Sequence, residues 1–126
     1  MVQWHRRYRR KSTSGKYNDD RKKKKSELGR HFGETKQGET TRRNIRTRGG
    51  NRKVRLYQEK FVNVSTADGT RRVEITDVIN NPANRNFARR KIMTAGAIVS
   101  TPLGNVRVTS RPGQVGVVSG VLSEKK

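Results

Sequence analysis

The most distinctive group of side chains with binding chemistry lies between Arg42 and Lys53, where arginine recurs at short intervals around paired glycines. A guanidinium group donates two parallel N–H groups to one phosphate, and glycine lets the backbone adopt a positive φ or approach a ligand closely. Arg46 and Arg48 flank Thr47, so in an extended chain both side chains would point to one side and grip neighbouring phosphates. The segment predicts a phosphate-gripping loop, and the alternative is a basic linker that turns into the first strand. The expected contact residues are Arg42, Arg43, Arg46, Arg48, Gly49, Gly50, Asn51, Arg52 and Lys53.

Aromatic rings alternate with basic groups near the beginning of the chain. Guanidinium groups bind phosphate oxygens, whereas tryptophan, tyrosine and histidine rings stack on exposed bases, so this mixture is typical of binding to single-stranded or looped RNA. The alternatives are a solvated tail and an anchor in which Trp4 packs on the folded domain. The expected RNA-binding residues are Trp4, His5, Arg6, Arg7, Tyr8, Arg9, Arg10 and Lys11.

Other basic groups carry charge without a distinctive arrangement. The run Lys22–Lys25 fits phosphate contact on charge density, but also a nuclear-import signal or a solubilising stretch. The cluster Arg89–Lys91 and Arg111 are expected on loops of the folded domain, where an exposed surface carries charge in any case. The expected contacts in these groups are Arg21, Lys22, Lys23, Lys24, Lys25, Arg30, Arg89, Arg90, Lys91 and Arg111.

Catalytic and metal-binding chemistry is poorly represented. The two histidines, His5 and His31, lie in the basic half with no carboxylate placed to orient them, and the chain has no cysteine. Ten acidic residues are too scattered for a metal cluster, and Asp19-Asp20 is better explained by local charge balance. The segment Arg48–Asn51 lacks the Lys-Ser/Thr ending of a nucleotide phosphate loop. We therefore expect no enzyme activity, no metal, no cofactor and no small-molecule substrate.

The charge balance indicates a polyanionic partner. Among 126 residues, 31 are Lys or Arg and 10 are Asp or Glu, which gives a formal charge of +21, and only 29% are hydrophobic. Such a chain repels itself, so RNA, DNA and an anionic membrane surface are the candidate partners. The sequence has no apolar signal segment, no membrane span and no sustained amphipathic helix, so we expect a cytoplasmic protein with no membrane partner.

Charge and hydrophobic patterning divide the chain near residue 50. Residues 1–60 hold 21 basic and 6 acidic residues, a net of +15, against 10 and 4 in residues 61–126, a net of +6. Between residues 12 and 52 the large apolar side chains are too few to offset the entropy lost on ordering. We predict a basic arm over residues 1–50 that orders mainly on RNA, a folded domain over residues 51–123 and a tail over residues 124–126.

Short alternating strands dominate from residue 51 onward. Val54 and Leu56 share one face of a predicted strand at 52–57. Residues 80–84 indicate a turn or a one-turn helix, with Asn81 as a candidate cap before Pro82. The other predicted strands span 61–64, 71–76, 97–100, 105–109 and 115–122, separated by turn signals at 68–69, 101–104 and 111–113. About six short strands at this spacing predict a mainly β fold, a small antiparallel β-barrel with an extended basic N-terminal arm and a core rich in valine.

Five blocks of the sequence together form a distinctive signature, namely Arg10–Gly15, Glu27–Arg30, Ile45–Arg55, Asn81–Asn84 and Val108–Gln114. On these blocks the chain resembles the ribosomal protein eight-e family of the archaeal and eukaryotic small subunit, over nearly its full length. Eukaryotic members carry a sizeable insertion that this chain lacks, so it is similar to the compact archaeal form. The resemblance implies a β-barrel with a basic arm, bound to small-subunit ribosomal RNA beside neighbouring small-subunit proteins.

Two other functions remain open from the residues alone. An architectural DNA-binding chromatin protein is also small, basic and β-rich, but it is expected to carry apolar wedges that kink a duplex, and few candidates exist here. An RNA-modifying enzyme fragment needs an acid, a thiol or a nucleotide loop for its chemistry, and the sequence offers none in a suitable pattern. Structural binding of ribosomal RNA is the favoured interpretation.

Overall fold

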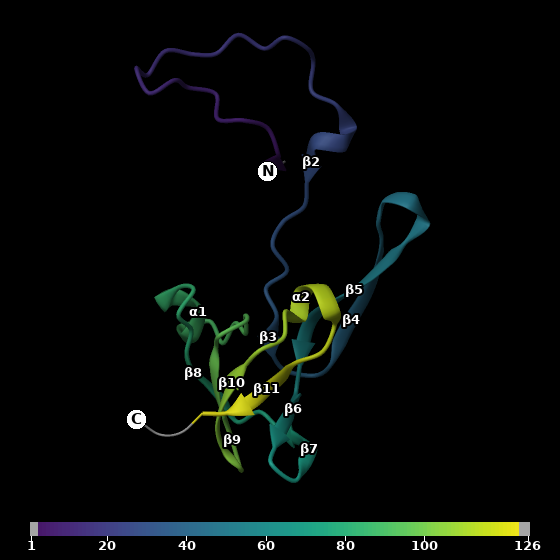
Figure 1. Cartoon of the computed structure of the whole chain (residues 1–126), viewed down its shortest axis with the longest axis vertical. Coiled ribbons are helices and arrows are strands. Elements are labelled where there is room, and N and C mark those ends of the chain that lie inside the picture. Colours follow the sequence, from purple (N-terminus) through teal and green to yellow (C-terminus); the bar gives the residue numbers. More distant parts are fainter. Residues whose placement is uncertain (1–2, 124–126) are drawn as a thin grey trace. The chain divides into compact units, whose positions relative to one another are not determined.

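The chain forms two compact units in a computed structural model that describes residues 3–123 (Figure 1). The N-terminal unit comprises Met1–Phe32 and the C-terminal unit Gly33–Lys126. This division lies closer to the N-terminus than the boundary expected near residue 50. The reason is that Lys36–Gln37 and Thr41–Arg46 form strands of the C-terminal unit.

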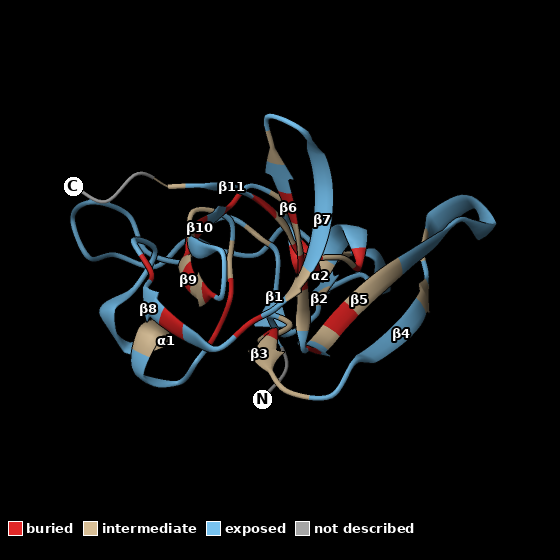
Figure 2. Ribbon diagram, turned by 90° about the horizontal axis from the view of Figure 1, so that it is seen from below, coloured by how far each residue is buried: buried red, intermediate tan, exposed pale blue. Residues whose placement is uncertain are grey.

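Two sheets build the C-terminal unit (Figures 1 and 2). The larger sheet has the order β7-β6-β11-β10-β9-β8, from β6 (Phe61–Thr66), β7 (Gly69–Glu74), β8 (Asp77–Asn80), β9 (Ile98–Thr101), β10 (Gly104–Val108) and β11 (Ser119–Leu122). The smaller sheet has the order β3-β5-β4, from β3 (Lys36–Gln37), β4 (Thr41–Arg46) and β5 (Arg52–Glu59). Neighbouring strands are antiparallel, except that β11 runs parallel to β6 and β3 runs parallel to β5.

The predicted mainly β architecture is confirmed, but the sheets do not close into a barrel. Strands β7 and β8 stand at the two ends of the larger sheet and do not pair with each other in the described residues. The parallel pair of β11 and β6 also departs from the expected all-antiparallel arrangement. Alternation in a sequence indicates which face of a strand is buried, but not which strand lies beside it. The number of strands alone could not decide whether the sheet closes.

Valine supplies most of the hydrophobic core, as the alternation predicts. Val62 and Val64 on β6, Val99 on β9 and Val106 on β10 are fully buried (Figure 2). Each such side chain contributes about 1.5–3 kcal/mol relative to an exposed one. Leu56 of β5 belongs to the same cluster, so the core joins β5 to the larger sheet.

A short helix, α1 (Arg85–Arg89), follows β8 and begins later than the predicted cap implies. Asn84 caps it, because its side-chain oxygen accepts a hydrogen bond from the N–H of Asn86 at 2.9 Å. Asn81 is buried instead, and its amide donates to the carbonyl of Ile92 at 2.9 Å. Asn81 Oδ1 also accepts a hydrogen bond from the N–H of Ala83 at 3.1 Å, so Asn81 caps the turn at 82–83, as predicted for the turn, and Asn84 caps the helix that follows.

A second helix, α2 (Pro112–Val115), replaces both the turn expected at 111–113 and the start of the last predicted strand. Proline suits the first helical turn, and Gly116 ends the helix with a φ of 81°. A Cβ atom at Gly116 would lie 2.5 Å from Cγ1 of Val54, so α2 packs directly on β5. No helix in residues 3–123 is long and apolar enough to cross a membrane.

The N-terminal unit is held together by backbone hydrogen bonds. Strand β1 (Gln3–Trp4) pairs antiparallel with β2 (Leu28–Gly29), and a 3₁₀ turn, η1 (Lys25–Glu27), directly precedes β2. In the segment of chain that joins β1 to β2, the N–H of Tyr17 donates to the carbonyl of Arg9 at 2.9 Å. That this part of the chain orders mainly on RNA stays a prediction.

Candidate nucleic-acid interface

The hairpin of β4 and β5 is densely basic and projects from the rest of the C-terminal unit (Figure 1). Residues 40–58 include seven Arg or Lys and no Asp or Glu. The antiparallel register places Arg46 opposite Arg52. Closer to the sheet, Arg43 lies opposite Arg55. Like charges directly opposite on paired strands are destabilising, so an anion lying across this ribbon would offset the repulsion.

The turn that joins β4 to β5 has the backbone conformation that its paired glycines predict. Gly49 has a φ of 71° and Gly50 a φ of 79°, both in the left-handed region, within a 3₁₀ turn, η2 (Arg48–Gly50). The predicted alignment of Arg46 and Arg48 on one side of an extended chain is wrong, because Arg48 already lies in this turn. Arg46 instead pairs across the ribbon with Arg52.

A buried carboxylate fixes the base of the hairpin. Glu59, at the end of β5, is 2% exposed. Arg42 Nη2 donates to its Oε2 at 2.9 Å, and Thr40 Oγ1 donates to its Oε1 at 2.6 Å. Burial acts to raise the pKa of Glu59, but these hydrogen bonds and the charge of Arg42 outweigh burial and hold that pKa below its ordinary value. Arg42 is therefore a structural cation that ties β4 to the end of β5.

Sequence reasoning missed three residues of β5, namely Glu59, Arg55 and Tyr57. Glu59 is the only acidic residue between Glu39 and Asp68, and that isolation was the available signal. Arg55 and Tyr57 alternate with the apolar residues of β5, which places them on the opposite face of the strand. The Arg43 Cζ atom lies 5.9 Å from the centre of the Tyr57 ring, within cation–π range.

The N-terminal unit holds two of its predicted contact residues in an internal ion-pair network. Arg6 Nη1 lies 3.1 Å from Asp19 Oδ1, and Arg6 Nε lies 3.7 Å from Glu27 Oε2. Arg21 also donates to Glu27, and mainly through this hydrogen bond the pKa of Glu27 is lowered from its ordinary value. Arg6 and Arg21 thus stabilise the loops of this unit, and the charge balance expected around Asp19 is made with Arg6.

Aromatic rings of the same unit lie beneath cations. Arg7 Cζ is 4.2 Å from the centre of the Tyr17 ring, and Lys23 Nζ is 5.3 Å from the centre of the Trp4 ring. Tyr8 is 78% exposed and presents most of its ring to solvent. The interleaving of aromatic and basic residues therefore produces cation–π contacts within the unit.

The remaining predicted residues are exposed, and some of them form ion pairs or hydrogen bonds with residues distant in the sequence. Those in exposed positions of the N-terminal unit are His5, Arg9, Arg10, Lys11, Lys22, Lys24, Lys25 and Arg30. In the C-terminal unit Arg90 pairs with Glu34, and Lys91 Nζ lies 3.2 Å from Asp77 Oδ1. Lys53 Nζ lies 3.1 Å from Gln114 Oε1 of α2. Arg89 ends α1, and Arg111 directly precedes α2.

In residues 3–123 no group of three or more His, Cys, Asp or Glu side chains is arranged to hold a metal ion.

Residues 4–123 match the family described as Ribosomal protein S8e. The chain belongs to this family. Small ribosomal subunit protein eS8 of Methanococcoides burtonii is 49% identical over 125 residues, which cover 98% of this S8e chain and 100% of the relative. The protein of the same name from Methanosarcina barkeri is 47% identical over the same shares of both chains. That of Nanoarchaeum equitans is 53% identical over 104 residues, 81% of this chain and 82% of the relative.

The family assignment made from sequence blocks is thus confirmed. The longest block, Ile45–Arg55, coincides in this S8e chain with the end of β4, the turn η2 and the first half of β5. The longest of the five blocks that carried the resemblance therefore forms the tip of the basic hairpin.

Proposed function

We propose that this protein is a structural constituent of the small subunit of the cytoplasmic ribosome, where it binds and stabilises folded ribosomal RNA. Its relatives are named small ribosomal subunit protein eS8 and align with nearly the whole chain. The partners of the protein are then small-subunit ribosomal RNA and neighbouring ribosomal proteins. Its role is binding rather than catalysis.

The observation that supports RNA binding most directly is the arrangement of charge on the β4–β5 hairpin. Arg46 faces Arg52 and Arg43 faces Arg55 across the ribbon, in a segment that has no acidic residue from Thr40 to Gln58. A protein that works alone gains nothing from such pairs, since each one opposes strand pairing. A phosphate backbone supplies negative charge, which residues 40–58 themselves do not contain, and arginine binds it through parallel N–H groups.

The proposed mechanism is charge neutralisation at a fixed position. RNA helices that approach one another repel through their phosphates, and bound cations release the counterions that otherwise screen this repulsion. The hairpin is anchored at its base by Glu59 and Leu56, so its arginines enter RNA from a rigid support. The N-terminal unit adds further cations, and ordering on RNA offsets part of its contact energy.

A salt titration with small-subunit ribosomal RNA tests the proposal, with duplex DNA of equal length as the competing ligand. The full-length protein should prefer the RNA, and its affinity should fall steeply with salt because many phosphates are neutralised. Arg46→Lys and Arg52→Lys should each weaken RNA binding by about 0.5–2 kcal/mol, because lysine keeps the charge but loses the paired N–H geometry.

The matched control is Lys22→Arg, which also keeps the charge at an exposed site and should bind as the wild type does. Equal affinity for DNA and RNA would contradict the ribosomal proposal in favour of an architectural DNA binder. Wild-type binding by both arginine variants at every salt concentration would mean that the hairpin contributes charge alone.

A further inference from the structure

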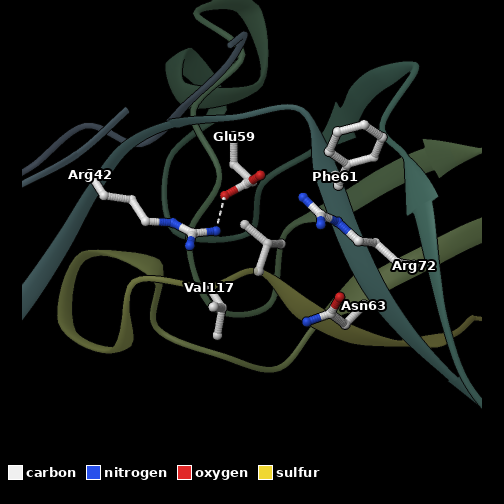
Figure 3. A pocket seen from close by; sticks show the side chains of 7 residues that line it. Arg42, Glu59, Phe61, Asn63, Arg72 and Val117 are labelled. Atoms are coloured by element: carbon white, nitrogen blue, oxygen red, sulfur yellow. Dashed lines mark hydrogen bonds and ion pairs between the residues drawn. The ribbon is translucent and has the colours of Figure 1, made fainter. Parts of the chain in front are cut away.

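A pocket of about 210 Å³ lies beside the base of the hairpin, among β4, β5, β6, β7 and the segment that precedes β11 (Figure 3). It is lined by Arg42, Glu59, Phe61, Asn63, Arg72, Val117 and Val118. Two guanidinium groups and one carboxylate leave it with a formal charge of +1, since +2 and −1 sum to +1. The pocket therefore combines a modest positive charge with an aromatic ring, an amide and two valines.

The pleat of β6 explains how these side chains come together. Val62 and Val64 are fully buried, so Phe61 and Asn63, which alternate with them, point to the opposite face of the sheet. The register of β6 with β7 places Arg72 directly opposite Asn63. Three polar or aromatic side chains of one hairpin thus share the outer face of the sheet.

Phe61 and Arg72 form a stacked pair at the side of the pocket. The Arg72 Cζ atom lies 4.4 Å from the centre of the Phe61 ring. Figure 3 shows Arg42 and Arg72 extending into the pocket from opposite sides, with Asn63 beneath Arg72. Arg42 is bound to Glu59. In the described part of the chain, the side chains of Asn63 and Arg72 have no hydrogen bond or ion pair, so their polar groups are available to a ligand.

We propose that this pocket receives one unstacked nucleotide of single-stranded or bulged RNA. The base stacks on the Phe61–Arg72 pair, because aromatic rings and guanidinium planes both stack on bases. The amide of Asn63 offers a donor and an acceptor to the edge of the base. The inference rests on the proposed RNA-binding function and adds a position at which a single nucleotide is recognised.

The lining favours a base over a phosphate group alone. The Glu59 carboxylate lies 2.9 Å from the Arg42 guanidinium and opposes a second anion at that end of the pocket. Phe61, Val117 and Val118 give the pocket apolar surface that a phosphate cannot use. A base uses the apolar surface by stacking, while its own phosphate reaches the guanidinium of Arg72.

Nuclear magnetic resonance of the full-length protein tests this with AMP, GMP, CMP and UMP, each compared with ribose 5-phosphate. Ribose 5-phosphate carries the same sugar and phosphate but no base. At least one nucleotide should shift the backbone amide resonances of Phe61, Asn63 and Arg72 saturably, with an affinity at least about fivefold above that of ribose 5-phosphate. Phe61→Leu keeps an apolar side chain of similar size and should remove this preference, as should Asn63→Ala.

The matched control is Arg71→Ala, which removes an exposed cation from the neighbouring position of β7 and should keep the preference. Equal affinity for ribose 5-phosphate and all four nucleotides would identify an anion site and overturn the inference. An unchanged preference in Phe61→Leu, or no saturable shift in the wild type, would overturn it as well. Affinity for ribosomal RNA is measured on the same samples, so failure of the pocket is distinguished from failure of the proposed function.

Discussion

Replacing Arg42 with alanine tests whether a buried ion pair fixes the base of the β4–β5 hairpin. The substitution removes a 2.9 Å hydrogen bond and leaves the Glu59 carboxylate, which is 2% exposed, with Thr40 as its side-chain partner. Breaking a fully buried pair costs about 3–5 kcal/mol, and a hydrogen bond to a charged group contributes about 1.5–3 kcal/mol. The Arg42 side chain is 45% exposed, so water replaces part of the contact, and we expect the free energy of unfolding to fall by about 1.5–3 kcal/mol.

The effect of Arg42→Ala should depend on pH. In the wild type the pKa of Glu59 lies below its ordinary value, so the contribution of this carboxylate is complete at neutral pH and is lost as pH falls through the lowered pKa. Burial acts to raise the pKa of this carboxyl group, and without Arg42 two of the influences that oppose burial are lost, so the pKa of Glu59 should lie higher in the variant than in the wild type. Protonation then removes an uncompensated buried charge. The stability deficit of the variant should therefore shrink between about pH 7 and about pH 4.

Urea unfolding followed by far-ultraviolet circular dichroism, at a fixed salt concentration of about 0.15 M, measures this deficit at both pH values. The matched control is Arg43→Ala, the neighbouring cation on β4, whose guanidinium lies over the Tyr57 ring. Its deficit should stay below about 1 kcal/mol and should not change with pH. A deficit of Arg42→Ala below about 0.5 kcal/mol at neutral pH, or one that is the same at both pH values, would refute the reasoning.

Three further predictions concern the two units. Deleting residues 1–32 removes 12 basic and 3 acidic residues, a net of +9. The deletion should lower RNA affinity and flatten the salt dependence of binding, whereas circular dichroism should still show the β-strand signal of the C-terminal unit. Gly116 and Gly96 both have a positive φ, but an added Cβ atom would meet Val54 only at Gly116. In urea unfolding, Gly116→Ala should therefore lower the free energy of unfolding of that unit by about 1–3 kcal/mol more than Gly96→Ala does. Backbone order parameters of the free protein should rise at Gly33 rather than at Arg42, because Thr35 is buried and donates to the carbonyl of Leu56 at 2.7 Å; low values through residues 33–41 would contradict this.

Strand β4 shows why the sequence placed the domain boundary too late. Five of its six residues are exposed and Ile45 is half-buried, so the strand carries no hydrophobic alternation. It is held by backbone pairing with β5 and by the ion pair of Arg42 with Glu59, and neither contact leaves a periodic signal. A strand at the edge of a sheet is specified largely by its partner, which pattern reading cannot identify.

Strand β6 and its hairpin partner β7 were predictable, because β6 has the alternation that β4 lacks. Val62 and Val64 alternate with polar residues, and the turn before Gly69 has a strong hairpin signal, so β6 and β7 were placed nearly correctly. The segment after Arg111 was not, because a valine and glycine alternation resembles a strand even where Pro112 begins a helical turn. Local patterns identified buried faces here, and tertiary contacts decided the helix.

Much of the candidate site was visible in composition, but its internal partners were not. The cluster of arginines and the left-handed glycines of the hairpin followed from residue type alone. The pairing of Arg6 with Asp19 joins residues 13 positions apart through loops that have no sequence period. Charge counting treats every cation alike, so it could not single out Arg6 as the partner of Asp19.

Sedimentation of a cell lysate through a sucrose gradient at high salt tests the central claim most directly. A structural constituent of the small subunit should migrate with small-subunit RNA, and it should stay there at salt concentrations that remove loosely bound basic proteins. Ribonuclease treatment should release the protein, whereas deoxyribonuclease should leave its position unchanged. Recovery of the protein at the top of the gradient, or its release by deoxyribonuclease alone, would contradict the account.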